Sequence, residues 1–131
     1  RERGATVIAV TVLTSLDATE LAAIGINVSP AEQVLRLVKL TQAAGLAGVV
    51  CSAQEISLVK GHCGPDFLTV VPGIRPAGAA HGDQKRVMTP GEAAQAGASH
   101  IVVGRPILAA ADPAAAARAI NLELAAAAGR Q

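Results

Sequence analysis

The chain has 131 residues, of which 51% are hydrophobic and 16% are charged, and its formal net charge is +1. This composition excludes a disordered chain, and the length is sufficient to bury a core. A net charge of only +1 provides no broad basic surface, and one Phe with no Trp and no Tyr provides no platform of stacking aromatic rings. Both features are typical of nucleic-acid binding, which is therefore not expected.

The start of the chain shows no secretory features, because an acidic helical stretch replaces a cleavage site after the first apolar run. No apolar run is long enough to cross a bilayer. We therefore expect a cytoplasmic protein in which Cys51 and Cys63 are reduced thiols. Because the chain begins with Arg1 and enters a predicted strand almost at once, we expect it to be part of a longer one.

Four apolar runs rich in β-branched residues predict strands over 6–13, 48–52, 67–71 and 100–104. They lack alternation of polar and apolar residues, which is typical of parallel strands covered on both faces. Each run is followed by a predicted helix whose start has capping-box spacing or an early proline. The capping-box pairs are Asp17 with Glu20, Ser29 with Glu32, Ser52 with Glu55, and Thr89 with Glu92.

The resulting β-α-β-α-β-α-β-α order predicts an α/β fold with a parallel sheet and right-handed crossovers. Two architectures satisfy it: an open doubly wound sheet, or part of a (β/α)8 barrel. A complete barrel usually needs about 250 residues, so four β/α units amount to half of one. No linker or repeat divides residues 1–131, which we expect to form one unit without an internal boundary.

Candidate binding residues follow three of the four predicted strands, where parallel α/β folds bind their ligands. Arg75 lies in the stretch PGIRPAG, and Arg105 lies in GRPI. The planar guanidinium group suits phosphate oxygens, Gln84 can donate an amide hydrogen, and Gly104 allows close approach of a ligand to the backbone. The hydroxyl of Thr14, after the first strand, is a candidate for binding a polar ligand group.

Each candidate has a simpler interpretation. Arg75 and Arg105 also fit surface arginines in polar loops, and Thr14 fits a residue that ends a strand and begins a turn. Lys85 and Arg86 are interpreted as a solvated face or as the approach to a helix.

The chain shows no obvious catalytic base. His62 beside Cys63 has no second ligand pair, so a metal site is not expected. Nucleophile-elbow, Walker and dinucleotide-binding motifs are all missing from the sequence.

Five stretches resemble bacterial orotidine monophosphate decarboxylase in the same order and at similar spacing: VTVLTS, AGLAGVVCSAQE, VPGIRPAGAAHGDQKRVMTP, AGASHIVVGRPI and AADPAAAARAIN. The resemblance covers nearly the whole chain and is to the carboxyl-terminal half of that enzyme. It implies strands five to eight of a (β/α)8 barrel. It also implies a homodimer that converts orotidine monophosphate to uridine monophosphate and CO2 without a metal or organic cofactor.

By the same resemblance, Arg75, Gln84, Gly104 and Arg105 bind the substrate phosphate, Thr14 contacts the pyrimidine, and segment 72–90 is a lid. The catalytic lysine of the family lies in an Asp-x-Lys-x-x-Asp motif on the third strand. Here only Asp83-Gln84-Lys85 is similar, with Met88 in place of the second aspartate. We therefore expect substrate-binding residues but no catalytic residue in this chain.

Two other functions remain open at this point. One is a related sugar-phosphate barrel enzyme such as hexulose phosphate synthase, and the other is a non-catalytic phosphate-binding or assembly module. In each case, half a barrel is expected to leave two open strand edges and an exposed apolar interior.

Overall fold

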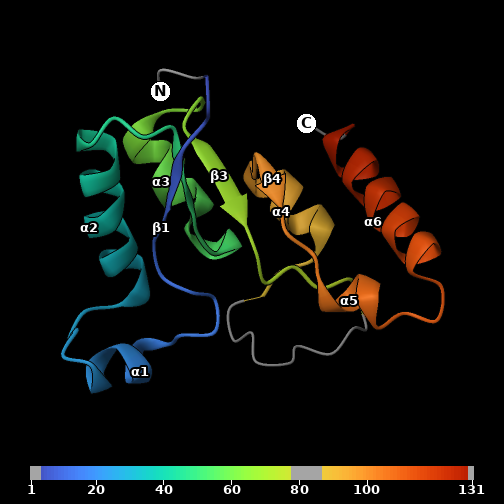
Figure 1. Ribbon diagram of the computed structural model, residues 1–131, viewed down its shortest axis with the longest axis horizontal. Helices are drawn as coiled ribbons and strands as arrows, with labels where there is room; N and C mark the ends of the chain where they lie inside the picture. The colour runs from blue at the N-terminus through green and yellow to red at the C-terminus, as the bar shows by residue number, and fades with distance from the viewer. Residues whose placement is uncertain (1–3, 78–86, 130–131) are drawn as a thin grey trace.

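A parallel four-stranded sheet in the order β1-β2-β3-β4 organises the molecule (Figure 1). The structure is a computed structural model that describes residues 4–77 and 87–129. The strands are β1 (Ile8–Val10), β2 (Gly48–Val50), β3 (Leu68–Val71) and β4 (His100–Ile101). Each strand pairs in parallel with the next along the chain, which confirms the expected β/α alternation.

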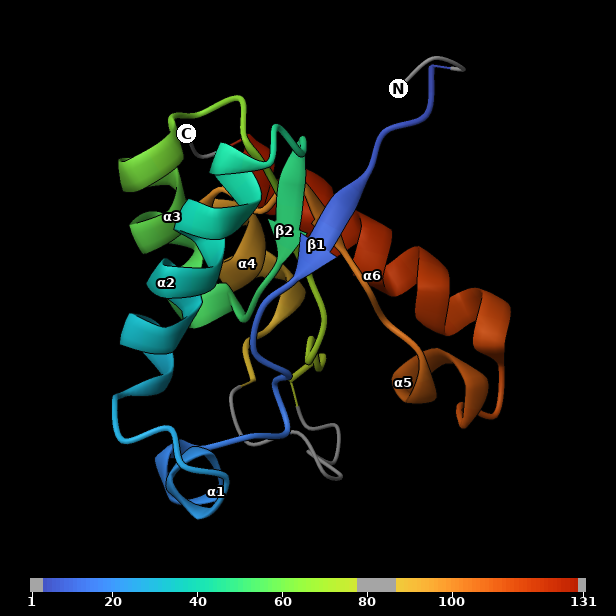
Figure 2. The ribbon, with the colours of Figure 1, turned by 60° about the vertical axis from the view of Figure 1, so that its left-hand side comes forward.

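Helices connect the strands and follow the last one. They are α1 (Ala18–Ala23), α2 (Pro30–Ala43), the short 3-10 helix η1 (Ala53–Glu55), α3 (Ile56–Cys63), α4 (Pro90–Ala96), α5 (Arg105–Leu108) and α6 (Pro113–Ala128). Helices α2 and α6 lie at opposite ends of the row of strands (Figures 1 and 2). Within the described ranges, no helix is both long enough and apolar enough to span a membrane.

The helix starts follow the capping prediction only in part. Both hydrogen bonds of the capping box form for Asp17 with Glu20 and for Thr89 with Glu92. The Ser29 hydroxyl accepts from the Glu32 N–H at 3.1 Å, but the Glu32 carboxylate pairs with Arg36 at 3.3 Å. The fourth predicted box pairs Ser52 with Glu55, and this partner is wrong. The Ser52 hydroxyl accepts from the Gln54 N–H instead, because a 3-10 helix begins there.

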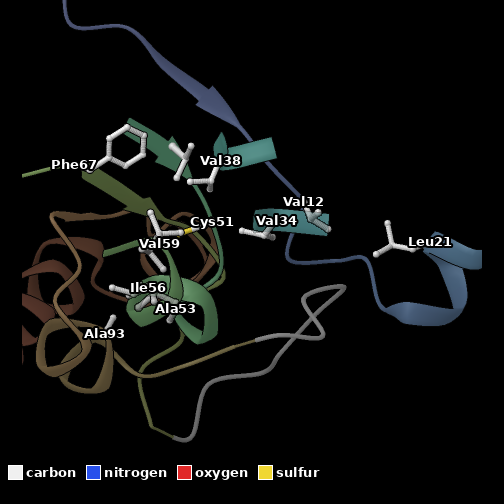
Figure 3. Close-up of a cluster of buried hydrophobic side chains, with 13 residues drawn as sticks. Val12, Leu21, Val34, Val38, Cys51, Ala53, Ile56, Val59, Phe67 and Ala93 are labelled. Atoms are coloured by element: carbon white, nitrogen blue, oxygen red, sulfur yellow. The ribbon is translucent and has the colours of Figure 1, made fainter. Parts of the chain in front are cut away.

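The hydrophobic core lies on the face of the sheet that the helices cover. Val49, Cys51 and Val71 are fully buried against Val34 and Val38 of α2 and Ile56 and Val59 of α3. Figure 3 shows several of these side chains converging between the strands and α3. Parallel strands need apolar residues here because they are covered by their own crossover helices.

The opposite face of the sheet is less covered. Val10, Val50 and Val70 are neighbours in the strand register, and they alternate with the buried row. Val10 is 59% exposed and Val102, just after β4, is 49% exposed. In the described part of the chain, β1 pairs only with β2 and β4 only with β3, so each keeps one open edge. The expected exposed apolar face and open edges are therefore confirmed.

A polar cluster joins the amino ends of β3 and β4. The Lys60 ammonium donates to the carbonyls of Pro65 and Phe67 at 2.9 and 2.7 Å and to the Ser99 hydroxyl at 3.2 Å. Ser99 in turn exchanges hydrogen bonds with Thr69. Because this end lies opposite the strand ends where ligands bind in such folds, the cluster is assigned to stability.

Candidate phosphate-binding site at the carboxyl ends of the strands

Three predicted site residues occupy equivalent places in the fold. Thr14, Arg75 and Arg105 each lie four positions beyond the last residue of their strand, which is Val10, Val71 or Ile101. Val71 and Ile101 are register partners, so Arg75 and Arg105 follow adjacent strands at matched positions. In Figures 1 and 2, the carboxyl ends of the strands point to the end of the molecule that holds α1 and α5. The three residues therefore all follow strand ends at the same end of the sheet.

Arg75 is a buried residue, which makes the interpretation as a surface arginine wrong at this position. Its relative exposure is 7%, and its Nη1 donates to the Ile74 carbonyl at 3.0 Å. The backbone N–H of Arg75 donates to the Met88 carbonyl at 3.0 Å, next to a parallel bridge between Ile74 and Met88. The segment at Met88, which is distant in sequence, therefore helps to fix the backbone of Arg75.

Arg105 has a different setting, at the start of α5 and exposed. Gly104 precedes it, and the Gly104 carbonyl accepts from the N–H groups of Ile107 and Leu108 at 3.0 Å each. A β-carbon built on Gly104 would meet no atom within 4 Å. The space beside the Gly104 backbone is therefore open, as close approach of a ligand requires.

Thr14 is buried, at 3% exposure, within the turn that follows β1. The turn is closed by a hydrogen bond from the Leu16 N–H to the Leu13 carbonyl at 3.0 Å. The interpretation of Thr14 as a turn residue is confirmed. Its predicted contact with a pyrimidine stays a prediction.

Gln84, Lys85 and Arg86 lie outside the described residues, as does Asp83. The predicted phosphate contact of Gln84 and the predicted lid over 72–90 therefore stay predictions. Residues 72–77 and 87–90, which flank this part, are described.

The two cysteines are free thiols, with Cys51 buried and Cys63 partly buried. Burial raises the pKa of the Cys63 thiol above its usual value. Among the described residues, no group of three or more His, Cys, Asp or Glu side chains is arranged to hold a metal ion.

The structure also reveals a contact near the site that sequence patterns did not indicate. Glu123 of α6 accepts a hydrogen bond from the Gly91 N–H at the start of α4, at 2.9 Å. The two residues are 32 positions apart, so neither spacing nor periodicity relates them.

The fold and the residues that follow the strand ends together define a class: four consecutive β/α units, half of a (β/α)8 barrel, with a candidate anion site at the carboxyl ends of its strands. A model of the Orotidine 5'-phosphate decarboxylase / HUMPS family matches residues 1–120. The chain belongs to this family.

Individual relatives agree with this assignment. The chain is 58% identical over 118 residues to the orotidine 5'-phosphate decarboxylase of Vibrio parahaemolyticus, covering 90% of the chain and 51% of that protein. It is 62% identical over 120 residues to the enzyme of the same name from Gluconobacter oxydans, covering 92% and 51%. The chain thus spans about half the length of the curated relatives it matches.

Solved structures give the same result for the fold. The crystal structure of orotidine 5'-phosphate decarboxylase from Lactobacillus acidophilus matches with a TM-score of 0.71 and 43% identity, covering 89% of this chain and 48% of that one. The enzyme of that name from Pyrococcus horikoshii, at 23% identity and a TM-score of 0.65, supports the fold alone.

Proposed function

We propose that this chain is the carboxyl-terminal half of an orotidine 5'-phosphate decarboxylase, the part that recognises the phosphate and the pyrimidine of the substrate. The reaction converts orotidine monophosphate to uridine monophosphate and CO2, without a metal or organic cofactor. The observation that carries the proposal is the placement of Arg75 and Arg105 at matched positions beyond the paired strands β3 and β4. The relatives named above support the choice of reaction within the family.

In this proposal, two arginines from adjacent β/α units bind the phosphate of the nucleotide. Charge-assisted hydrogen bonds from guanidinium to phosphate are roughly twice as strong as neutral ones. Gly104 lets a phosphate oxygen approach the backbone, and Thr14 contacts the pyrimidine. Gln84 keeps its assignment to the phosphate by family resemblance alone.

Binding the phosphate contributes to the reaction although it lies far from the bond that breaks. Binding energy from a non-reacting group can hold the ring in a preorganised, water-excluded site. Loss of CO2 leaves negative charge on a ring carbon, which positioned cationic and hydrogen-bonding groups stabilise. The Asp-x-Lys-x-x-Asp motif that carries the family's catalytic lysine is missing from this chain. In this proposal, the catalytic lysine and aspartates therefore belong to the other four β/α units.

The partner that the proposal requires is therefore an amino-terminal half-barrel that pairs with the open edges of β1 and β4. The same proposal assigns the completed enzyme to a homodimer in the cytoplasm. Alone, the chain is expected to be inactive.

The direct test is reconstitution of a barrel. This chain is produced together with the amino-terminal half of the Gluconobacter oxydans relative, and release of CO2 from orotidine monophosphate is measured. Activity is expected with both halves and from neither half alone. No activity from a well-formed complex would favour a non-catalytic module, and turnover of a ribulose phosphate in its place would favour a sugar-phosphate enzyme.

A further inference from the structure

Helix α6 contacts both parts of the chain that hold the two arginines. It packs extensively against α4, which begins just after the connection that contains Arg75, and it packs against α5, whose first residue is Arg105. Figure 1 shows α6 alongside α4, with α5 at its amino end. A cavity of about 230 Å³ lies between α6 and the residues that follow the two arginines, lined by Pro76, Pro106, Ala116, Ala119, Ile120 and Glu123. Pro76 and Pro106 directly follow the two arginines in sequence.

Glu123 makes a polar link within this contact. Its Oε1 accepts from the backbone N–H of Gly91 at 2.9 Å in a partly buried setting. Gly91 is the second residue of α4, where a backbone N–H has no acceptor within the helix. A β-carbon at position 91 would lie 3.2 Å from the same carboxylate oxygen, so the glycine leaves room for the carboxylate.

A short, well-bonded stretch connects Gly91 to Arg75. Thr89 and Glu92 form both bonds of a capping box, at 3.2 and 2.8 Å, which fixes the chain immediately around Gly91. One residue earlier, the Met88 carbonyl accepts the backbone N–H of Arg75 at 3.0 Å. The stretch is thus bonded to Arg75 at one end and to α6 at the other.

We propose that Glu123 is a positioning residue for the phosphate site: by fixing the start of α4 to α6, it holds the Arg75 segment in place relative to α5 and Arg105. The inference rests on the proposed function, because it assumes that both arginines bind one phosphate. Glu123 acts through the backbone of other residues and touches no substrate.

The test uses the barrel completed with the amino-terminal half described above. Glu123→Ala removes the acceptor, whereas Glu123→Gln keeps a carbonyl oxygen that can accept from Gly91. Gly91→Ala crowds the same hydrogen bond from the other side. The matched control is Ser29→Ala, which removes one capping acceptor from α2, a helix at the other end of the row of strands.

Two quantities are measured for each variant: the Kd values of uridine monophosphate and uridine, and the hydrogen-exchange rate of the Arg75 backbone amide. For Glu123→Ala, we expect about tenfold weaker binding of the nucleotide, an unchanged Kd for uridine, and about tenfold faster exchange at Arg75. Gly91→Ala should show a smaller loss of the same kind. Glu123→Gln and Ser29→Ala should keep the preference for the nucleotide.

The outcomes separate the inference from the proposed function. If the unsubstituted barrel binds uridine as tightly as uridine monophosphate, both are overturned. If it prefers the nucleotide and Glu123→Ala keeps that preference with unchanged exchange at Arg75, only the role of Glu123 is overturned. Equal weakening of both ligands would make Glu123 merely structural. If Glu123→Ala fails to fold, the Kd values and the Arg75 exchange rate are compared between Gly91→Ala and Glu123→Gln. A weaker preference for the nucleotide in Gly91→Ala alone supports the role of Glu123, and equal results for the two variants overturn it.

Discussion

Arg75 and Arg105 have similar sequence contexts, each followed by a proline, but the structure gives them different environments. Arg75 is buried and bonded to a carbonyl, whereas Arg105 is exposed at a helix start. A buried guanidinium is already ordered, so it loses little freedom when a ligand binds. In the proposed site, the exposed guanidinium of Arg105 contributes positive charge.

This difference predicts unequal effects on stability. Arg75→Met should lower the free energy of unfolding by about 1–3 kcal/mol, because it leaves the buried Ile74 carbonyl without this donor. Arg105→Met should change the same quantity by less than about 0.5 kcal/mol, as is usual for exposed sites. Chemical denaturation of the completed barrel measures both. Equal destabilisation by the two substitutions would contradict the assigned environments.

Gly104 allows a separate test at the same scale. Gly104→Ala should leave stability within about 0.5 kcal/mol, since its β-carbon would meet no atom in the unliganded protein. If the proposed function is right, the substitution should weaken uridine monophosphate about tenfold, because the methyl group takes the space that the proposal gives to a phosphate oxygen. Thermal unfolding and calorimetric titration give the two values. Unchanged nucleotide binding would remove Gly104 from the site.

At the scale of elements, Gly48 sets the approach of β2 to β3. A β-carbon at position 48 would collide with the backbone oxygen and the β-carbon of Leu68. Gly48→Ala is expected to lower the free energy of unfolding by about 2 kcal/mol or more. The control is Gly61→Ala in α3, where a β-carbon would meet nothing and alanine should stabilise by about 0.5–1 kcal/mol. If both substitutions stabilise the protein, the close β2–β3 contact is wrong.

Local signals in the sequence predicted the elements well. The capping pairs Asp17 with Glu20 and Thr89 with Glu92 mark the starts of α1 and α4, since both bonds involve neighbouring residues. The strands at the sheet edges are shorter than their apolar runs, with β4 limited to His100–Ile101 against a prediction of 100–104. The central strands β2 and β3 are also shorter than their apolar runs, because apolar residues continue past the ends of the strand pairing.

Contacts between distant residues could not be predicted in this way. The hydrogen bond of Lys60 to Ser99 joins residues 39 positions apart, and that of Glu123 to Gly91 joins residues 32 apart. For the site, the position of Arg75 and Arg105 after strand ends was visible in sequence. The burial of Arg75 was not, because burial depends on contacts between segments distant in sequence, such as the hydrogen bond from its backbone N–H to the Met88 carbonyl.

At the scale of the whole molecule, the open side of the sheet is the main feature. Val10 and Val102 are largely exposed, and β1 and β4 each have an open edge among the described residues. Apolar surface next to open strand edges promotes association. We expect the chain alone to self-associate in sedimentation analysis and to form a one-to-one complex when the amino-terminal half is added. A monomeric chain with a cooperative thermal transition would contradict this.

The proposed binding of one phosphate by two β/α units also belongs to the scale of the whole molecule. A double-mutant cycle with Arg75→Met and Arg105→Ala in the completed barrel, read as Kd values for uridine monophosphate and uridine, tests it most directly. Arg105→Ala should weaken the nucleotide by about 2–4 kcal/mol and scarcely affect uridine, and the two substitutions should be coupled by about 1 kcal/mol or more. Equal losses for both ligands, or losses that add without coupling, would show that the two arginines do not share a phosphate.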